Sequence, residues 1–96
     1  MAFVLIARMT AKDGEQDRAA ELIPKLVEAT RQEPGNREYI AHRDPEDPRV
    51  FLMYEQYDDK AAFEAHGASE HFKELGVGQL FDLMENRERA FYETLD

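Results

Sequence analysis

Residues 33–72, EPGNREYIAHRDPEDPRVFLMYEQYDDKAAFEAHGASEHF, decide the fold of this chain. The stretch combines Asn36 at a turn, two facing strand segments, and a helix that carries His66 on its apolar side. This layout predicts a small pocket with one titratable group pointing into it. The flanking segments are expected to complete the walls of that pocket.

Two strands are predicted within this stretch, at residues 36–43 and 49–57, and the turn sequence DPEDP joins them. Alternation along the second strand places four residues on one face: Phe51, Met53, Glu55 and Tyr57. The opposite face carries Val50, Leu52, Tyr54 and Gln56. Neither face is freely polar, so both faces of the sheet are expected to be covered.

A helix is predicted after Asp58-Asp59, which can cap it, with Ala62, Phe63 and His66 on one side and Gly67 at its end. Ser69 can cap a short continuation, EHFKEL. A further short helix is expected at residues 79–84, and a last strand at residues 86–95.

The N-terminal part predicts a strand at residues 3–9, with apolar residues on both faces, and then a helix that opens at Asp13-Gly14. The helix shows one apolar stripe, formed by Ala19, Leu22, Ile23, Leu26, Val27 and Thr30. An interior Pro costs about 3 kcal/mol unless the helix bends, so Pro24 predicts a kink. The helix is expected to end at Pro34-Gly35.

The order β-α-β-β-α-β predicts an α+β, ferredoxin-like fold with a four-stranded antiparallel sheet, in one domain over residues 1–96. Helices can cover only one face of such a sheet. Because the second face is also apolar, a homodimer that packs through the sheet is expected. The last strand, with Phe91 and Leu95, is the segment expected to reach across.

The composition narrows the classes of partner. Twelve basic and 21 acidic residues give a net charge of −9, which disfavours nucleic acid and anionic membranes as partners. There is no cysteine, so disulfides and thiol catalysis are excluded. The N-terminal run MAFVLIARM lacks the features of a signal peptide and is too short to span a membrane, so a cytoplasmic protein is expected.

Four motifs carry a resemblance to a known family: E-P-G-N-x-x-Y, D-P-E-D-P, F-x-x-Y-E-x-Y and A-F-x-A-H-x-x-S-x-H-F. They resemble the antibiotic biosynthesis monooxygenase (ABM) superfamily over essentially the whole chain. The resemblance implies a dimeric α+β barrel. It leaves the reaction open, because the family includes cofactor-free quinol and anthrone monooxygenases, haem-degrading enzymes and an autoinducer-phosphate isomerase.

The resemblance also implies a substrate pocket between the sheet and the helices. Its expected walls are Phe51, Met53, Glu55, Tyr57, Phe63, His66, Phe72 and Phe81. Met53 and Tyr57 stand where the anthrone-type members have Asn and Trp. Haem degradation is not expected, because the chain has no Trp and Gly76 falls near the position of the family's His.

His66 is the candidate catalytic base, because a neutral imidazole can remove a phenolic proton from a bound quinol. The alternative is a core histidine that hydrogen-bonds a strand carbonyl. Glu55 is the second catalytic candidate. Enclosed in the pocket it would have a raised pKa, and it could orient His66 or act as a base. Its alternative role is an ion pair with Arg87 or Arg89.

The remaining candidates have plainer alternatives. Tyr39, Tyr54 and Tyr57 could line a flat aromatic site or simply pack in the sheet. Asn36 could contact a ligand or shape the turn. His71 is expected at the helix surface or the pocket mouth, and His42 in solvent.

No metal site or cofactor is expected. His66, Glu70 and His71 are metal-ligand types, but Gly67 interrupts their helix and no third ligand occurs at a suitable spacing. Ser69, the only serine, lacks the frame of a hydrolase nucleophile, and no phosphate-binding glycine motif follows a strand.

The predicted function is therefore a cofactor-independent monooxygenase that oxidises a small quinol- or anthrone-like aromatic with O2. One alternative is an isomerase of a small phosphorylated sugar-like signal, with Arg37 or Arg43 holding the phosphate. Another alternative is a non-catalytic small-molecule-binding or dimerisation module.

Overall fold

The structure is a computed structural model that describes residues 1–96. Its elements follow one another as β1 (Phe3–Ala11), α1 (Gln16–Thr30), β2 (Asn36–Arg43), β3 (Val50–Tyr57), α2 (Lys60–Gly67), η1 (Phe72–Leu80), η2 (Phe81–Leu83) and β4 (Met84–Glu93). The βαββαβ order confirms the predicted ferredoxin-like fold, with two further short helices before the last strand.

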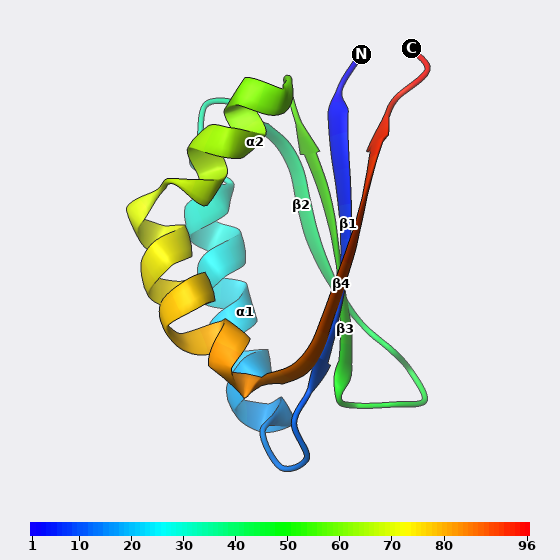
Figure 1. Cartoon of the computed structure of the whole chain (residues 1–96), viewed down its shortest axis with the longest axis vertical. Helices are drawn as coiled ribbons and strands as arrows, with labels where there is room; N and C mark the ends of the chain where they lie inside the picture. Colours follow the sequence, from blue (N-terminus) through cyan, green and yellow to red (C-terminus); the bar gives the residue numbers. More distant parts are fainter.

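The four strands form one antiparallel sheet in the order β2-β3-β1-β4. All helices lie on one face of this sheet, and the other face carries no element of the chain (Figure 1). The strand register determines which side chains share a face of the sheet. Leu5 pairs with Glu55 and Phe91 on the face that the helices cover, and Ile6 pairs with Tyr54 and Ala90 on the opposite, bare face.

Short polar side chains stabilise the connections before and after β3, which forms a hairpin with β2. In the DPEDP turn, Asp44 Oδ1 accepts hydrogen bonds from the backbone N–H groups of Glu46 at 2.8 Å and Asp47 at 3.1 Å. Asp59 caps α2 as predicted, accepting from the N–H of Ala62 at 2.8 Å. These bonds set where β3 begins and where the helix that carries His66 starts.

Most of the predicted elements occur, but several of their bounds differ. The first strand continues past residue 9 to Ala11, and the last strand spans Met84–Glu93 instead of residues 86–95. The first helix ends at Thr30, before Pro34-Gly35, because residues 31–35 turn instead to reach β2. The predicted helix at residues 79–84 is wrong: a π-helix runs from Phe72 to Leu80, a 3-10 turn follows, and Met84 already belongs to β4. Pro24 lies inside α1, and the kink expected there stays a prediction.

The core lies between α1 and the sheet. Leu22, Ile23 and Leu26 of α1 are at most 3% exposed, and they pack with Met9 and Met53 of the sheet. No helix combines the length and the apolar character that crossing a membrane requires.

Candidate functional site

A cavity of about 440 Å³ lies between the sheet and the helices. Seven of the predicted site residues line it: Tyr39, Met53, Glu55, Phe63, His66, Phe72 and Phe81. Sequence reasoning did not include several further wall residues, namely Leu5, Ala7, Met9, Leu26, Leu80, Arg87 and Arg89. The volume falls within the roughly 300–1,000 Å³ typical of small-molecule sites.

Four predicted pocket residues do not line the cavity. Phe51 is buried in the core, where the guanidinium of Arg43 lies over its ring. The amide of Asn36 donates to the carbonyls of Glu38 and Gln56, so it shapes the start of β2. Tyr57 donates a hydrogen bond to the cavity residue Glu55, and His71 contacts Glu33, but neither side chain lines the cavity.

His66 belongs to α2 and is only 2% exposed. Aromatic rings surround it, with the ring centroid of Phe72 at 4.8 Å, that of Tyr57 at 5.4 Å and that of Tyr39 at 5.6 Å. The face of α2 that carries Ala62 and His66, four residues apart, points toward the loop after α1. A rigid helix and an aromatic cage therefore hold the imidazole at the cavity.

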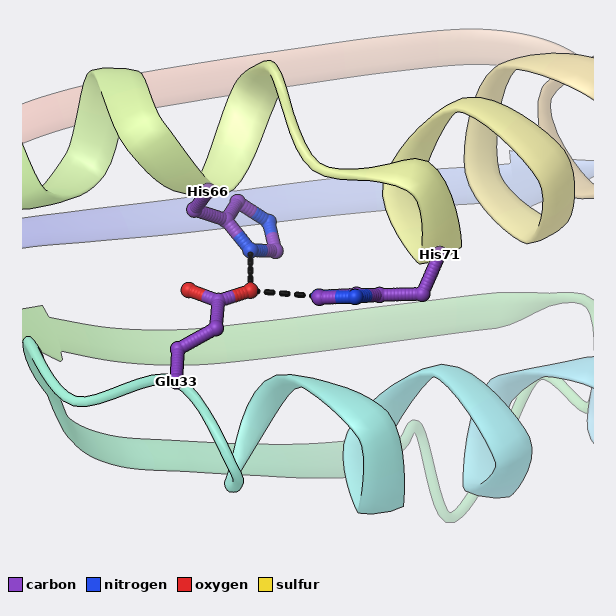
Figure 2. A group of neighbouring side chains, drawn as sticks. All are labelled: Glu33, His66 and His71. Carbon is purple, nitrogen blue, oxygen red and sulfur yellow. Dashed lines mark hydrogen bonds and ion pairs between the residues drawn. The ribbon is translucent and has the colours of Figure 1, made fainter.

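Glu33 is the partner of His66. Its Oε2 lies 2.7 Å from His66 Nδ1, which excludes the alternative bond from His66 to a strand carbonyl. An ionised carboxylate only accepts hydrogen bonds, so Nδ1 carries the proton and Nε2 keeps the lone pair. Figure 2 shows the second ring nitrogen of His66 pointing away from Glu33, and no group of the chain bonds to it.

The loop after α1 places Glu33 for this contact. Its backbone N–H donates to the carbonyl of Thr30 at 3.0 Å, and its own carbonyl accepts from Asn36 at 3.1 Å. Gly35 lets the loop approach α2: a Cβ at this position would lie 2.5 Å from the Cβ of Ala62. The sequence Pro34-Gly35-Asn36 thus brings the Glu33 carboxylate next to α2.

His71 approaches the same carboxylate oxygen from the other side. Its Nε2 lies 2.5 Å from Glu33 Oε2 and 3.1 Å from Ser69 Oγ. Ser69 donates to the carbonyl of His66 at 2.6 Å and accepts from the N–H of Phe72, so it acts as the predicted cap. The His71 side chain is 24% exposed, so it lies between the buried Glu33–His66 pair and the solvent.

Burial lowers the pKa of His66 below its ordinary value, and the hydrogen bond to Glu33 offsets this only in part. The imidazole is therefore neutral near pH 7, with its basic nitrogen available. Glu55 is 3% exposed, and burial raises its pKa to about 7 despite the hydrogen bond that it accepts from Tyr57 at 2.6 Å.

Two expectations for Glu55 need correction. Its hydrogen-bond partner is Tyr57, and Glu33 is the carboxylate that orients His66. Glu55 forms no ion pair with Arg87 or Arg89, whose guanidinium groups lie over the rings of Phe81 and Phe91 at 3.9 and 5.3 Å. The predicted rise in its pKa has the expected direction and cause.

Arg37 and Arg43 do not face the cavity. Arg37 pairs with Asp58 at 2.8 Å, and Arg43 donates to the carbonyl of Pro48. His42, expected in solvent, is exposed and has its Nδ1 3.0 Å from the carbonyl of Leu52. The cationic groups at the cavity are instead Arg87 and Arg89.

The structure assembles a group of metal-ligand types that the sequence did not reveal. The ligand atoms of Glu33, His66 and His71 all lie within 4.8 Å of one another. Glu70, the carboxylate considered from the sequence, is not part of this group. The third ligand type comes from a loop 33 positions before His66, so local spacing could not show it.

Comparison with known proteins gives a consistent answer. The family model for antibiotic biosynthesis monooxygenase matches residues 2–75. PA3566 from Pseudomonas aeruginosa is 33% identical, with a TM-score of 0.91 over 99% of this chain and 95% of that one. A crystallised antibiotic biosynthesis monooxygenase is 30% identical, with a TM-score of 0.90 over 98% of this chain and 99% of that one.

A further relative from Nitrosomonas europaea, assigned to the same group, is 25% identical, with a TM-score of 0.92 over 98% of this chain and 90% of that one. No curated protein matches the chain. The family model covers most of the sequence, and the two more similar structures extend the likeness over nearly all of it. The chain belongs to the antibiotic biosynthesis monooxygenase family.

Proposed function

We propose that this protein is a cofactor-independent monooxygenase that oxidises a small quinol- or anthrone-like aromatic with O2. The observation that carries the proposal is the Glu33–His66 pair at the cavity, with Nδ1 bound to the carboxylate and Nε2 free to accept a proton. Family membership supports monooxygenase chemistry in general terms.

The cavity suits a flat aromatic molecule. Phe63, Phe72 and Phe81 supply aromatic walls, and Met53 supplies a deformable one. The phenylalanines do not fill the space shut, because about 440 Å³ remains between them and the sheet. This room supports a bound ligand over a purely structural module.

The proposed reaction begins when His66 Nε2 takes the phenolic proton of the substrate. The resulting anion gives one electron to O2, and the carbon radical and superoxide then combine to form a C–O bond. The proton on His66 completes a hydroperoxide. Loss of the remaining C–H proton breaks the O–O bond and releases water, so that RH2 and O2 become R=O and H2O.

Glu33 has a positioning role in this scheme. It holds the reactive tautomer of His66 and stabilises the imidazolium that forms when Nε2 is protonated, as the carboxylate does in a serine-protease triad. Glu55, with a pKa of about 7, can exchange a proton with bound substrate on the sheet side of the cavity.

An oxygen electrode tests the proposal. Metal-free and flavin-free protein is mixed with a series of quinols and anthrones, and oxygen uptake is compared with that of His66→Ala and of the control His42→Ala. His42 lies on the exposed edge strand, outside the cavity. Equal uptake by wild type and His66→Ala would contradict the proposed base.

One observation favours a second candidate, the isomerase of a phosphorylated sugar-like signal. Arg87 and Arg89 line the cavity and form no ion pair, so an anionic group has a place to bind there. His66 and Glu55 could then shuttle a proton between substrate carbons. Phosphate protection of Arg87 and Arg89 from dicarbonyl modification, without any oxygen uptake, would favour this candidate over the first.

A further inference from the structure

We propose that Glu33, His66 and His71 bind one divalent ion of the zinc class, and that binding reverses the tautomer of His66. Three separate segments supply the ligands: the loop after α1, helix α2 and the turn that precedes η1. In Figure 2 both imidazoles converge on one carboxylate oxygen.

The distances are close to what an ion needs. His66 Nδ1 and His71 Nε2 lie 2.7 and 2.5 Å from Glu33 Oε2, and all three ligand atoms fall within 4.8 Å. Tetrahedral zinc with bonds of about 2.0 Å places its ligand atoms roughly 3.3 Å apart. To reach this spacing, the Glu33 carboxylate oxygen must withdraw from both nitrogens, and the two imidazole nitrogens, which lie within 4.8 Å of each other, must adjust toward about 3.3 Å.

The chemistry of the three groups fits zinc and similar ions. Two imidazoles and one carboxylate form the ligand set of many catalytic zinc and non-haem iron sites, with further positions left for water. The His66 side chain is 2% exposed, that of Glu33 14% and that of His71 24%, so an ion would enter past His71. The carboxylate offsets one of the two positive charges.

Metal binding has a defined effect on the protons. A neutral imidazole has one N–H, and a metal takes the lone pair of the nitrogen that it binds. The proton on His66 Nδ1 must therefore move to Nε2, and the proton on His71 Nε2 must move to Nδ1. The nitrogen of His66 that does not face Glu33 then donates a hydrogen bond and can no longer accept a proton.

This consequence links the site to activity. A metal at Nδ1 would block proton removal by His66, so the ion is an inhibitor and not a cofactor of the reaction. That inhibition rests on the proposed function. Metal binding and tautomer reversal do not rest on it, and they can be measured without any turnover.

Calorimetry tests the binding. Chelator-treated protein is titrated with Zn²⁺, with Glu33→Gln and His71→Asn as ligand variants and His42→Asn as the matched control. We expect one ion per chain, and a loss of affinity in the ligand variants at least as large as the roughly 100-fold that outer-shell changes can cause. Circular dichroism confirms that each variant is folded. Unchanged affinity in both folded ligand variants overturns the site.

Nitrogen NMR of the histidine side chains tests the tautomer in wild-type protein, without any substitution. We expect His66 to be protonated at Nδ1 before Zn²⁺ is added and at Nε2 afterwards. Stoichiometric binding with an unchanged His66 tautomer overturns the proposal. If the tautomer reverses but Zn²⁺ leaves oxygen uptake intact, the metal site stands and the role of His66 as base is refuted.

Discussion

Glu33 Oε2 lies 2.7 Å from His66 Nδ1, although the two residues are 33 positions apart in the chain. The contact joins a loop to a helix and leaves Nε2 of the imidazole as the free base. Geometry of this kind gives a carboxylate two tasks, holding one tautomer and stabilising the imidazolium. Its removal should therefore affect the chemical step more than substrate binding.

Glu33→Gln should lower kcat by about 100-fold or more and change KM little, because a neutral amide neither fixes the tautomer nor stabilises the imidazolium. Steady-state oxygen uptake with the best quinol substrate measures both constants. Glu70→Gln is the matched control, since Glu70 is exposed and lies one position before His71. A fall in kcat/KM that comes only from KM would show that Glu33 contributes to binding instead.

The sequence predicted many of the residues that line the cavity, but it did not predict the contact between Glu33 and His66. Strand alternation correctly placed Met53 and Glu55 on the cavity side, because the side-chain period of two survives in any sheet. Glu33 was missed because its role depends on how a loop folds back onto a helix. The one signal in the sequence was Pro34-Gly35, directly after Glu33. The glycine there allows the loop to pass close to Ala62 of α2, in addition to following the end of α1.

The last strand shows the same limit. Alternation could have placed Arg87 and Arg89 on the same side as Phe91, but only the pairing with β1 shows that this side faces the cavity. The start of β4 was also misjudged. A π-helix followed by a 3-10 turn brings the chain to β4 earlier than a regular helix at residues 79–84 would.

Gly35→Ala should weaken both stability and activity. The added Cβ would lie 2.5 Å from that of Ala62, so α2 must move away from the loop that carries Glu33. Overpacking of this kind costs about 1–3 kcal/mol. Thermal unfolding and oxygen uptake measure the two effects.

The stability control for Gly35→Ala is Gly67→Ala, at the end of the same helix, where an added Cβ meets nothing within 4 Å. Gly67 lines the cavity, so this variant is compared by thermal unfolding alone. That variant should be as stable as wild type or slightly more so. The double variant Gly35→Ala, Ala62→Gly should recover part of the loss, because it removes the clashing atom. A Gly35→Ala protein as stable and active as wild type would show that the loop and helix are not tightly coupled.

The bare face of the sheet predicts a homodimer. Ile6 lies on that face between Tyr54 and Ala90 in neighbouring strands, and no helix of the chain covers it (Figure 1). Light scattering after gel filtration should give twice the chain mass of 11.2 kDa. Ile6→Glu should shift the mass toward the monomer, since a buried unpaired charge strongly opposes association.

Val77→Glu is the control for the dimer. Val77 is 52% exposed and belongs to η1, on the helical side of the molecule. The same charge placed there should leave the dimer intact. If Val77→Glu dissociates the protein and folded Ile6→Glu does not, the subunits meet through the helices and the sheet-to-sheet model is wrong.

Glu55 should make the protein less stable as pH rises from about 4.5 to about 7. Burial raises its pKa in the folded state to about 7, from an ordinary value of 4.5, so the folded protein binds the proton more tightly than the unfolded chain. Stability is therefore highest below the unfolded pKa and falls as pH approaches the folded pKa, by about 3 kcal/mol for a shift of this size.

Urea unfolding of wild type and Glu55→Gln at a series of pH values isolates this effect, because other groups titrate equally in both proteins. The stability difference between Glu55→Gln and wild type should grow over this range and level off above about pH 7. A difference independent of pH would mean that folding does not raise the pKa of Glu55.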